Sequence, residues 1–421
     1  MYIRKYLIIY LLFINNHAFA EQLSIADAIK ISLEQNLELA TAKLIVEKAK
    51  ARLHDAGRME NPELEFAWES DRSFQNEGEN TKSVALKQKF PITNKLSIAK
   101  EVAQIDLAMA IAEINNQQRL LVGEVSLKMR ALAVIDQRIK INSKLQKDLK
   151  ELIEVSQVKS KAAEISITDL NFQKLELQNL ELEKNRLKIK RKDLQLSLNV
   201  FLNRTADDEI LVSESIELLL NPLTLEEAKD SALQKRGDLE MLSFAINRSK
   251  SEHKLAKASR WEDWTVGLEY KEEKSIYDLA SVSSSKDEFF GVTLSIPLPL
   301  WNQRKGQVLE AQVSESQSLL QHQALELEII NEIESLYNQL SLLRSSLEIY
   351  QSKSLELAEA NEKLIREGYL QGIVGINQLI QSRQQLAINK QGYADLLEQF
   401  YTTLTTFETV SASSPYYEEL Q

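Results

Sequence analysis

Residues 175–201 read LELQNLELEKNRLKIKRKDLQLSLNVF and contain two seven-residue repeats of apolar side chains. One repeat is Leu175, Leu182, Ile189 and Leu196, and the other is Leu180, Leu187, Leu194 and Phe201. The repeats are offset by about 150° around a coiled-coil helix, whereas a dimeric coil needs only one seam. Two seams on nearly opposite faces predict a helix with a neighbour on each side, as in a hollow barrel of helices. A solid bundle helix is the alternative that this stretch leaves open.

Long helices are predicted elsewhere because the residues that break helices are scarce. Residues 95–159 contain one Gly, Gly123, and no Pro, and residues 303–367 contain only Gly306 and no Pro. Each stretch of ~65 residues predicts a helix of ~95 Å. The seven-residue rhythm recurs at Ile329, Leu336, Leu343, Tyr350, Leu357 and Leu364, and then at Leu379, Leu386, Tyr393, Phe400 and Phe407. A rhythm sustained this far predicts left-handed supercoiling.

The chain is a tandem repeat, because LSIADA at residues 23–28 recurs as LTLEEA at residues 223–228. Matched order in two halves indicates one architecture built twice. Each half is predicted to hold two short helices, two strands and a long helical hairpin. The predicted organisation is a signal peptide at 1–20, a first repeat at 21–203, a linker at 204–222, a second repeat at 223–410 and a tail at 411–421.

Residues 1–20 resemble a secretory signal. Arg4 and Lys5 precede an apolar run of about nine residues, which is too short to span a bilayer, and Ala18-Phe19-Ala20 fits a cleavage site. Nothing later supplies ~18 unbroken apolar residues, so strands must cross a bilayer if the chain crosses one at all. The formal charge is 51 − 62 = −11, and nucleic acid as a partner is not expected because phosphate binding needs a basic surface.

Four segments, residues 63–69, 83–90, 263–271 and 290–298, alternate apolar and polar side chains. This pattern fits strands with lipid on one side and water on the other, although a half-buried soluble sheet also alternates. The polar residues 71–82 and 272–287 are predicted to be external loops. The predicted lipid-facing side chains are Phe66, Trp68, Leu86, Val266, Leu268, Val292 and Leu294.

Four strands cannot close a barrel, and open edges in lipid leave backbone groups unpaired. Copies of the chain must therefore combine if the strands lie in a membrane. Two copies supply eight strands, which make a filled barrel, and three supply twelve, which leave room for water. A pore favours three copies.

The layout resembles the TolC family of outer-membrane efflux channels. One subgroup of this family works with metal-exporting pumps of the cobalt-zinc-cadmium type. Its second strand-to-helix junction is similar to residues 291–306, GVTLSIPLPLWNQRKG. The family's periplasmic turn resembles Tyr369-Leu370-Gln371-Gly372. The resemblance covers about residues 22–410. It implies a mainly α fold with a small β part, in which four strands per chain contribute to a shared trimeric barrel.

The resemblance also implies partners and a location. These are a homotrimer in outer-membrane lipid that extends into the periplasm, a periplasmic adaptor, and an inner-membrane pump of the RND type. The implied function is a passive exit duct for heavy-metal cations. The alternatives are a drug-efflux or type I secretion duct of the same family and, less well supported, a periplasmic adaptor or a soluble coiled-coil scaffold.

The family resemblance directs attention to the two hairpin turns. Some relatives carry acidic rings just after the second turn, but residues 376–380 contain no carboxylate. Glu164 and Asp169 beside the first turn are the remaining gate candidates, together with Tyr369 and Gly372 at the second turn. The alternative is that Glu164 and Asp169 are surface carboxylates that only stabilise the start of a helix. Ala163 stands where the second turn has Gly372, so a differently built first turn is expected.

Sequence motifs for chemistry are lacking. Cysteine is absent and only four His occur, so thiolate chemistry is excluded and a metal cluster is not expected. His54 and His253 lie at similar places in the two halves without a second ligand at i+4. No phosphate loop or nucleophile elbow is present. The sequence therefore predicts no enzyme activity and no cofactor.

Overall fold

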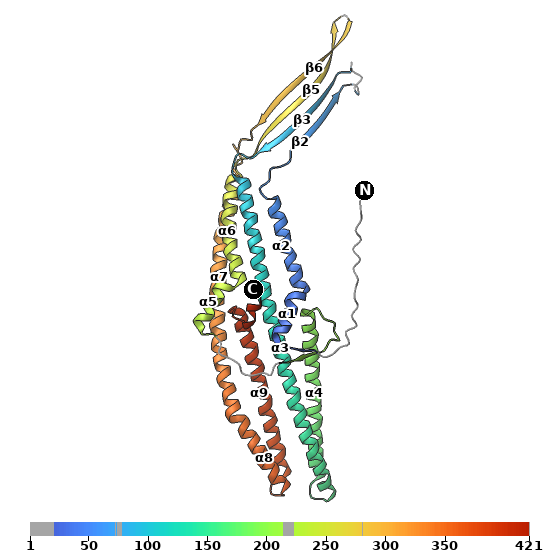
Figure 1. Cartoon of the computed structure of the whole chain (residues 1–421), viewed down its shortest axis with the longest axis vertical. Helices are drawn as coiled ribbons and strands as arrows, with labels where there is room; N and C mark the ends of the chain where they lie inside the picture. Colours follow the sequence, from blue (N-terminus) through green and yellow to red (C-terminus); the bar gives the residue numbers. More distant parts are fainter. Residues whose placement is uncertain (1–20, 72, 74–77, 214–222, 280, 421) are drawn as a thin grey trace. The chain divides into compact units, whose positions relative to one another are not determined.

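The computed structural model describes residues 21–71, 73, 78–213, 223–279 and 281–420 (Figure 1). The predicted signal peptide and residues 214–222 of the predicted linker lie outside this range. The chain divides into a helical unit, residues 1–40, 117–235 and 329–421, and a strand unit, residues 41–116 and 236–328. Three helices run through both units, namely α2 (Leu37–Asp55), α3 (Lys95–Lys161) and α7 (Lys305–Ile349).

The helical unit contains two helical hairpins. The first hairpin is α3 with α4 (Ile167–Phe201), and the second is α7, the π-helical segment η2 (Tyr350–Leu355), α8 (Glu356–Leu370) and α9 (Ile376–Val410). The smaller elements are β1 (Glu21–Leu23), α1 (Ile25–Gln35), β4 (Ile210–Val212), α5 (Leu225–Lys235) and the 3-10 helix η3 (Pro415–Leu420). The predicted mainly α architecture is confirmed.

The two apolar stripes of α4 have different environments. In one stripe Leu187 is buried and Leu180, Leu194 and Phe201 are half-buried. In the other, Leu175, Leu182 and Ile189 are 55%, 59% and 64% exposed. One stripe therefore packs inside the chain and the second faces outward without cover from the described residues. This agrees with the prediction that α4 packs against a neighbouring helix on each side.

The short helices start alike in the two repeats. Ser24 accepts a hydrogen bond from the Asp27 amide at 3.0 Å, and Thr224 accepts one from the Glu227 amide at 3.4 Å. Each carboxylate in turn accepts from the amide of its capping residue. These reciprocal bonds satisfy amides that a helix start leaves unpaired. The Ser24 and Thr224 hydroxyls also donate to the carboxylates at 2.6 and 2.8 Å, and these hydroxyl bonds, followed by the amide bonds, lower the pKa of Asp27 and of Glu227.

The prediction of one unbroken helix over residues 303–367 is wrong at η2. Gly392 of α9 lacks a side chain opposite Tyr350: a Cβ there would lie 2.9 Å from the Tyr350 hydroxyl. A π-helical turn accommodates an extra residue, so it changes which side chains face a neighbour. Ile333, Leu340 and Leu347 before η2 are buried, while Leu357 and Leu364 after it are exposed.

The strand unit contains α6 (Gly237–Ala258) and one antiparallel sheet of β2 (Glu63–Ser70), β3 (Asn80–Phe90), β5 (Trp264–Leu279) and β6 (Ser281–Ser295), in the order β2-β3-β5-β6. The predicted loop at 272–287 is wrong, since β5 and β6 continue through it and stay paired from Thr265 with Ser295 to Leu279 with Ser281. Ile296 and Leu298, predicted to be strand residues, follow the end of β6.

Part of the predicted linker is packed against α4. β4 pairs in parallel with β1, and Ile210 is fully buried. Arg191 and Gln195 of α4 donate hydrogen bonds to the carbonyls of Ile210 and Asp208 at 3.1 and 2.7 Å. This segment was not predicted to be ordered because its backbone is held by side chains from another element.

Candidate membrane sheet and helical tip

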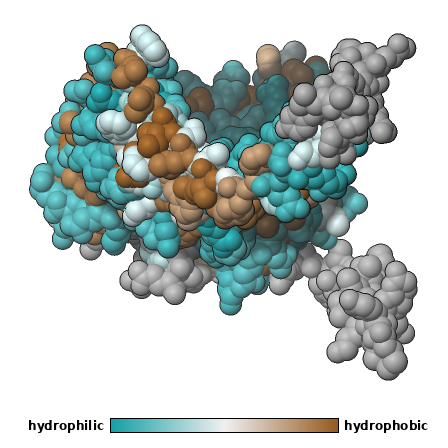
Figure 2. Space-filling model, turned by 90° about the horizontal axis from the view of Figure 1, so that it is seen from above, coloured by the Kyte–Doolittle hydropathy of each residue, from teal (hydrophilic) through white to brown (hydrophobic). Residues whose placement is uncertain are grey.

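The register of the sheet aligns the predicted lipid-facing side chains in rows across the strands. Leu64, Leu86, Leu268 and Val292 are consecutive partners across all four strands. The rows on either side contain Phe66 and Val84, and Val266 and Leu294. Figure 2 shows apolar side chains gathered in a band bordered by hydrophilic ones. All predicted lipid-facing residues, including Trp68, lie on this one face, hereafter the apolar face.

The side chains of the apolar face are well exposed in the single chain. Phe66 and Trp68 are 72% and 73% exposed, Val292 and Leu294 are also exposed, and Val266 is half-buried. No helix in the described part of the chain is long and apolar enough to cross a membrane. An apolar area of this kind marks a surface for contact with another molecule or with lipid.

The opposite, polar face carries more carboxylates than lysines. Its rows include Glu65 with Glu269 on either side of Ala85, and Glu69 with Glu273 on either side of Thr81. Lys87 pairs with Glu65 across the β2-β3 pair. Composition alone does not say which way the acidic side chains point, because that depends on register. The register places them together, away from the apolar face.

The two hairpin turns have the same backbone conformation. Ala163 has φ +59° and Gly372 has φ +77°, both in the left-handed region. The Ala163 and Gly372 amides donate to carbonyls three residues earlier, at 3.1 and 3.0 Å, and the next amides donate to carbonyls five residues earlier, both at 2.9 Å. The expectation of a differently built first turn is wrong, because Ala163 adopts the conformation for which Gly is preferred.

The gate candidates of the first turn lie at the start of α4. Ser166 caps this helix by accepting from the Thr168 amide at 3.2 Å, Glu164 is exposed, and Asp169 lies in the first turn. Among the described residues neither carboxylate has an ion-pair partner. Asp169 stands where a carboxylate stabilises the helix dipole.

Tyr369 is buried between the hairpins near the turns. It belongs to an apolar cluster with Leu149, Leu170 and Leu379 from α3, α4 and α9. The Lys159 ammonium lies 4.8 Å from the Tyr369 ring centre, and the Tyr369 hydroxyl lies 3.4 Å from the Ser156 hydroxyl. Tyr369 therefore joins the second hairpin to α3 of the first, a contact that sequence spacing alone does not reveal.

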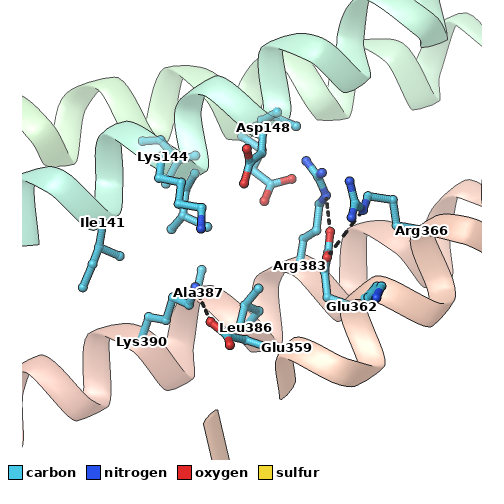
Figure 3. A pocket seen from close by; sticks show the side chains of 15 residues that line it. Ile141, Lys144, Asp148, Glu359, Glu362, Arg366, Arg383, Leu386, Ala387 and Lys390 are labelled. Atoms are coloured by element: carbon cyan, nitrogen blue, oxygen red, sulfur yellow. Dashed lines mark hydrogen bonds and ion pairs between the residues drawn. The ribbon is translucent and has the colours of Figure 1, made fainter. Parts of the chain in front are cut away.

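A cavity of about 400 Å³ lies between the hairpins. Figure 3 shows Lys144 and Asp148 on α3 facing Glu362, Arg383 and Lys390 of the second hairpin. Arg383 pairs with Glu362 at 3.2 Å, and Lys390 pairs with Glu359 at 2.8 Å. Glu176 of α4 also lines the cavity, and burial raises its pKa while Arg383 opposes the rise. Sequence analysis missed this site because its residues come from four helices.

The histidines do not form a metal site in the described residues. His253 Nδ1 lies 3.2 Å from a Glu315 oxygen. His54 contacts only its sequence neighbours Asp55 and Arg58 among the hydrogen bonds of the described residues. No group of three or more potential ligands gathers within the described range. His54 and His253 therefore stay outside the candidate site.

Comparisons with known proteins support the family resemblance. Residues 229–412 match the model of a family described as outer membrane efflux protein. The first half repeats the same order of helices and strands. The matched residues make up most of the second repeat. The predicted resemblance to outer-membrane efflux channels of the TolC family is thereby confirmed, and the family description agrees with the predicted outer-membrane location. A comparison with curated protein sequences finds no match.

Solved structures share the fold of this chain. A crystal structure of CusC, reported in a study of its folding and transmembrane channel formation, aligns with a TM-score of 0.77 at 14% identity. The alignment covers 94% of this chain and 93% of the CusC chain. VceC of Vibrio cholerae gives 0.71 at 14%, with 92% and 95% covered. The CmeC channel of Campylobacter jejuni gives 0.70 at 12%, with 94% and 88% covered. At these identities the likeness establishes the fold alone.

Proposed function

We propose that three copies of this efflux protein form a passive exit duct through the outer membrane, in which each chain supplies four of twelve strands. The duct would work with a periplasmic adaptor and an inner-membrane pump of the RND type. The observation that carries the proposal is the four-stranded sheet with one apolar face and two outer strands, β2 and β6, whose outer edges have no strand partner among the described residues.

The physical argument concerns these two strand edges. Unpaired backbone groups in hydrocarbon cost several kcal/mol each, so an open sheet cannot stay in a bilayer. Pairing β6 of one chain with β2 of the next would satisfy both edges. Twelve strands enclose a water-filled space, whereas eight give an interior filled by side chains. Three copies are therefore the smallest symmetric set that supports a duct.

The helices support the same stoichiometry. The outward stripe of α4, Leu175, Leu182 and Ile189, has no apolar cover in one chain, and Leu357 and Leu364 of α8 are also exposed. Apolar side chains repeated every seven residues pack into a neighbouring helix. A ring of three chains supplies that neighbour to every copy.

For the substrate we propose heavy-metal cations. The junction at residues 291–306 is similar to that of the metal-efflux subgroup, and the polar face of the sheet carries more carboxylates than lysines. If this face lines the duct, its negative potential raises the local concentration of cations. The duct itself needs no metal site, because selection belongs to the pump.

Purification in detergent followed by recording in a planar bilayer tests the duct. A trimer that conducts ions is expected. A species that remains monomeric and passes no current would overturn the proposal.

Deletion of the protein in its host tests the substrate. Increased sensitivity to zinc, cadmium or copper, restored by the wild-type chain, is expected. Sensitivity to organic drugs with unchanged metal tolerance would favour the drug-efflux alternative instead.

A further inference from the structure

The contact between the two helical hairpins contains polar groups that lack partners. Glu176 Oε2 is buried without a hydrogen bond, and Gln173, one turn earlier on α4, is fully buried with neither amide atom bonded. A buried polar group without a partner destabilises the packed state. Leu170 and Leu177, on the same side of α4, belong to or pack against the apolar cluster around Tyr369. The same interface therefore contains apolar side chains that stabilise the packed hairpins and polar groups without partners that destabilise them.

The cations that face Glu176 are already engaged by other carboxylates. Arg383 of α9 pairs with Glu362 of α8 at 3.2 Å, with both side chains largely buried, and Arg366 lies 3.8 Å from the same carboxylate. Lys390 of α9 pairs with Glu359. Among the charged groups that line the cavity, Lys144 and Asp148 of α3 and Lys363 of α8 complete the set. Glu176 thus lies in a charged cavity without an ion-pair partner of its own in the described chain.

We propose that Glu176 is a proton-controlled latch between the two hairpins. Uncharged, it allows α4 to remain packed against α8 and α9. Charged, it draws water into the cavity and favours separation of the hairpins. Arg383 sets the pH at which the change occurs, because its positive charge on the other hairpin opposes the effect of burial on Glu176. This regulation goes beyond the proposed duct function and does not depend on the transported compound.

The direction of the pH effect follows from proton linkage. Burial makes Glu176 bind its proton more tightly when the hairpins are packed than when the cavity is hydrated. Protonation therefore favours the packed state at acidic pH. As pH rises through the raised pKa of the packed state, that contribution is lost. Asp148 and Glu362 are less suited to the role. No oxygen of Asp148 is among the buried atoms without a hydrogen bond in the described residues, and Glu362 is held by two arginines.

Hydrogen exchange of the full-length protein in detergent tests the latch. After correction for intrinsic rates, amides of residues 170–180 and 379–390 should be severalfold better protected at mildly acidic than at neutral pH. Glu176→Gln should give high protection at both pH values. Glu181→Gln is the matched control, because Glu181 is exposed on the same helix and pairs with Lys150 within the first hairpin at 3.6 Å; it should keep the wild-type response.

A second variant keeps the test decisive if Glu176→Gln alters folding. Arg383→Gln removes the opposing cation, while Arg366 remains beside Glu362. The midpoint of the pH response should move to higher pH. Protection that does not change with pH in the wild type, an unchanged response in Glu176→Gln, or a midpoint that moves to lower pH in Arg383→Gln would each overturn the proposal.

Discussion

Gly372 offers a clean measure of backbone strain at the tip of the second hairpin. Its φ is +77°, and a Cβ added there meets no atom within 4 Å. Gly372→Ala should therefore lower the free energy of unfolding by about 1 kcal/mol through the left-handed conformation alone. Thermal unfolding followed by helical circular dichroism measures this change.

Gly375 supplies the control for that substitution. It has φ −75° and equally open surroundings. Gly375→Ala should cost less than Gly372→Ala, because its φ suits any residue and only the preference for Gly over Ala at a helix N-cap is lost. Equal losses in the two variants would show that space or flexibility, and not the sign of φ, decides the tolerance of this turn.

A buried ion pair links α3 to α9. Arg130 contacts Glu408 at 2.7 Å, both side chains are nearly buried, and Arg130 also donates to Thr405 at 2.6 Å. Glu408→Leu should cost about 3–5 kcal/mol, because it leaves a buried charge without its partner. The double variant with Arg130→Met should recover much of that loss. Unfolding midpoints of the four members of this cycle give the coupling, and additive losses would contradict it.

At the level of single elements, the sheet separates two neighbouring side chains of β6. Leu294 lies on the apolar face opposite Val266, while Thr293 points to the polar face opposite Gly267. Leu294→Arg should hinder insertion by roughly 2–4 kcal/mol if the apolar face meets mid-bilayer lipid. Thr293→Arg, with the same added charge, should insert normally. The yield of folded protein in outer-membrane fractions measures both, and equal yields would reverse the assignment of the faces.

The elements differ in how far they could be predicted from sequence. The faces of the strands were predictable, because side chains alternate between the two faces of a strand whichever strand it pairs with. The extra length of β5 and β6 was not, since residues 272–287 are mostly polar and their few apolar residues do not alternate, as in a loop. The segment η2 depends on the space left by Gly392, and the turn at Ala163 lacks the glycine that signals such turns.

The same limit applies to the candidate site. Tyr369 was identified through the turn that contains it, but its contacts with Ser156 and Lys159 depend on how the two hairpins pack. Glu176 and Arg383 each look like ordinary solvated helix residues in the sequence. Only the packing of α4 near α9 makes Glu176 a half-buried carboxyl and places the opposing charge of Arg383 within reach of it.

At the scale of the whole molecule, α4 carries one set of apolar residues that packs within the chain and another that is available for the proposed assembly of three copies. Leu187 is 7% exposed and packs within the chain, whereas Ile189, two residues later, is 64% exposed on the outward stripe. Ile189→Asp should leave the fold of the single chain intact but weaken the trimer, because the new charge enters the proposed interface between copies. Leu187→Asp should destabilise the chain itself. Native mass spectrometry in detergent reports the trimer, and circular dichroism reports the fold. A trimer unaffected by Ile189→Asp would remove this stripe from the interface between copies, and the uncovered apolar residues of α4 would then need another partner.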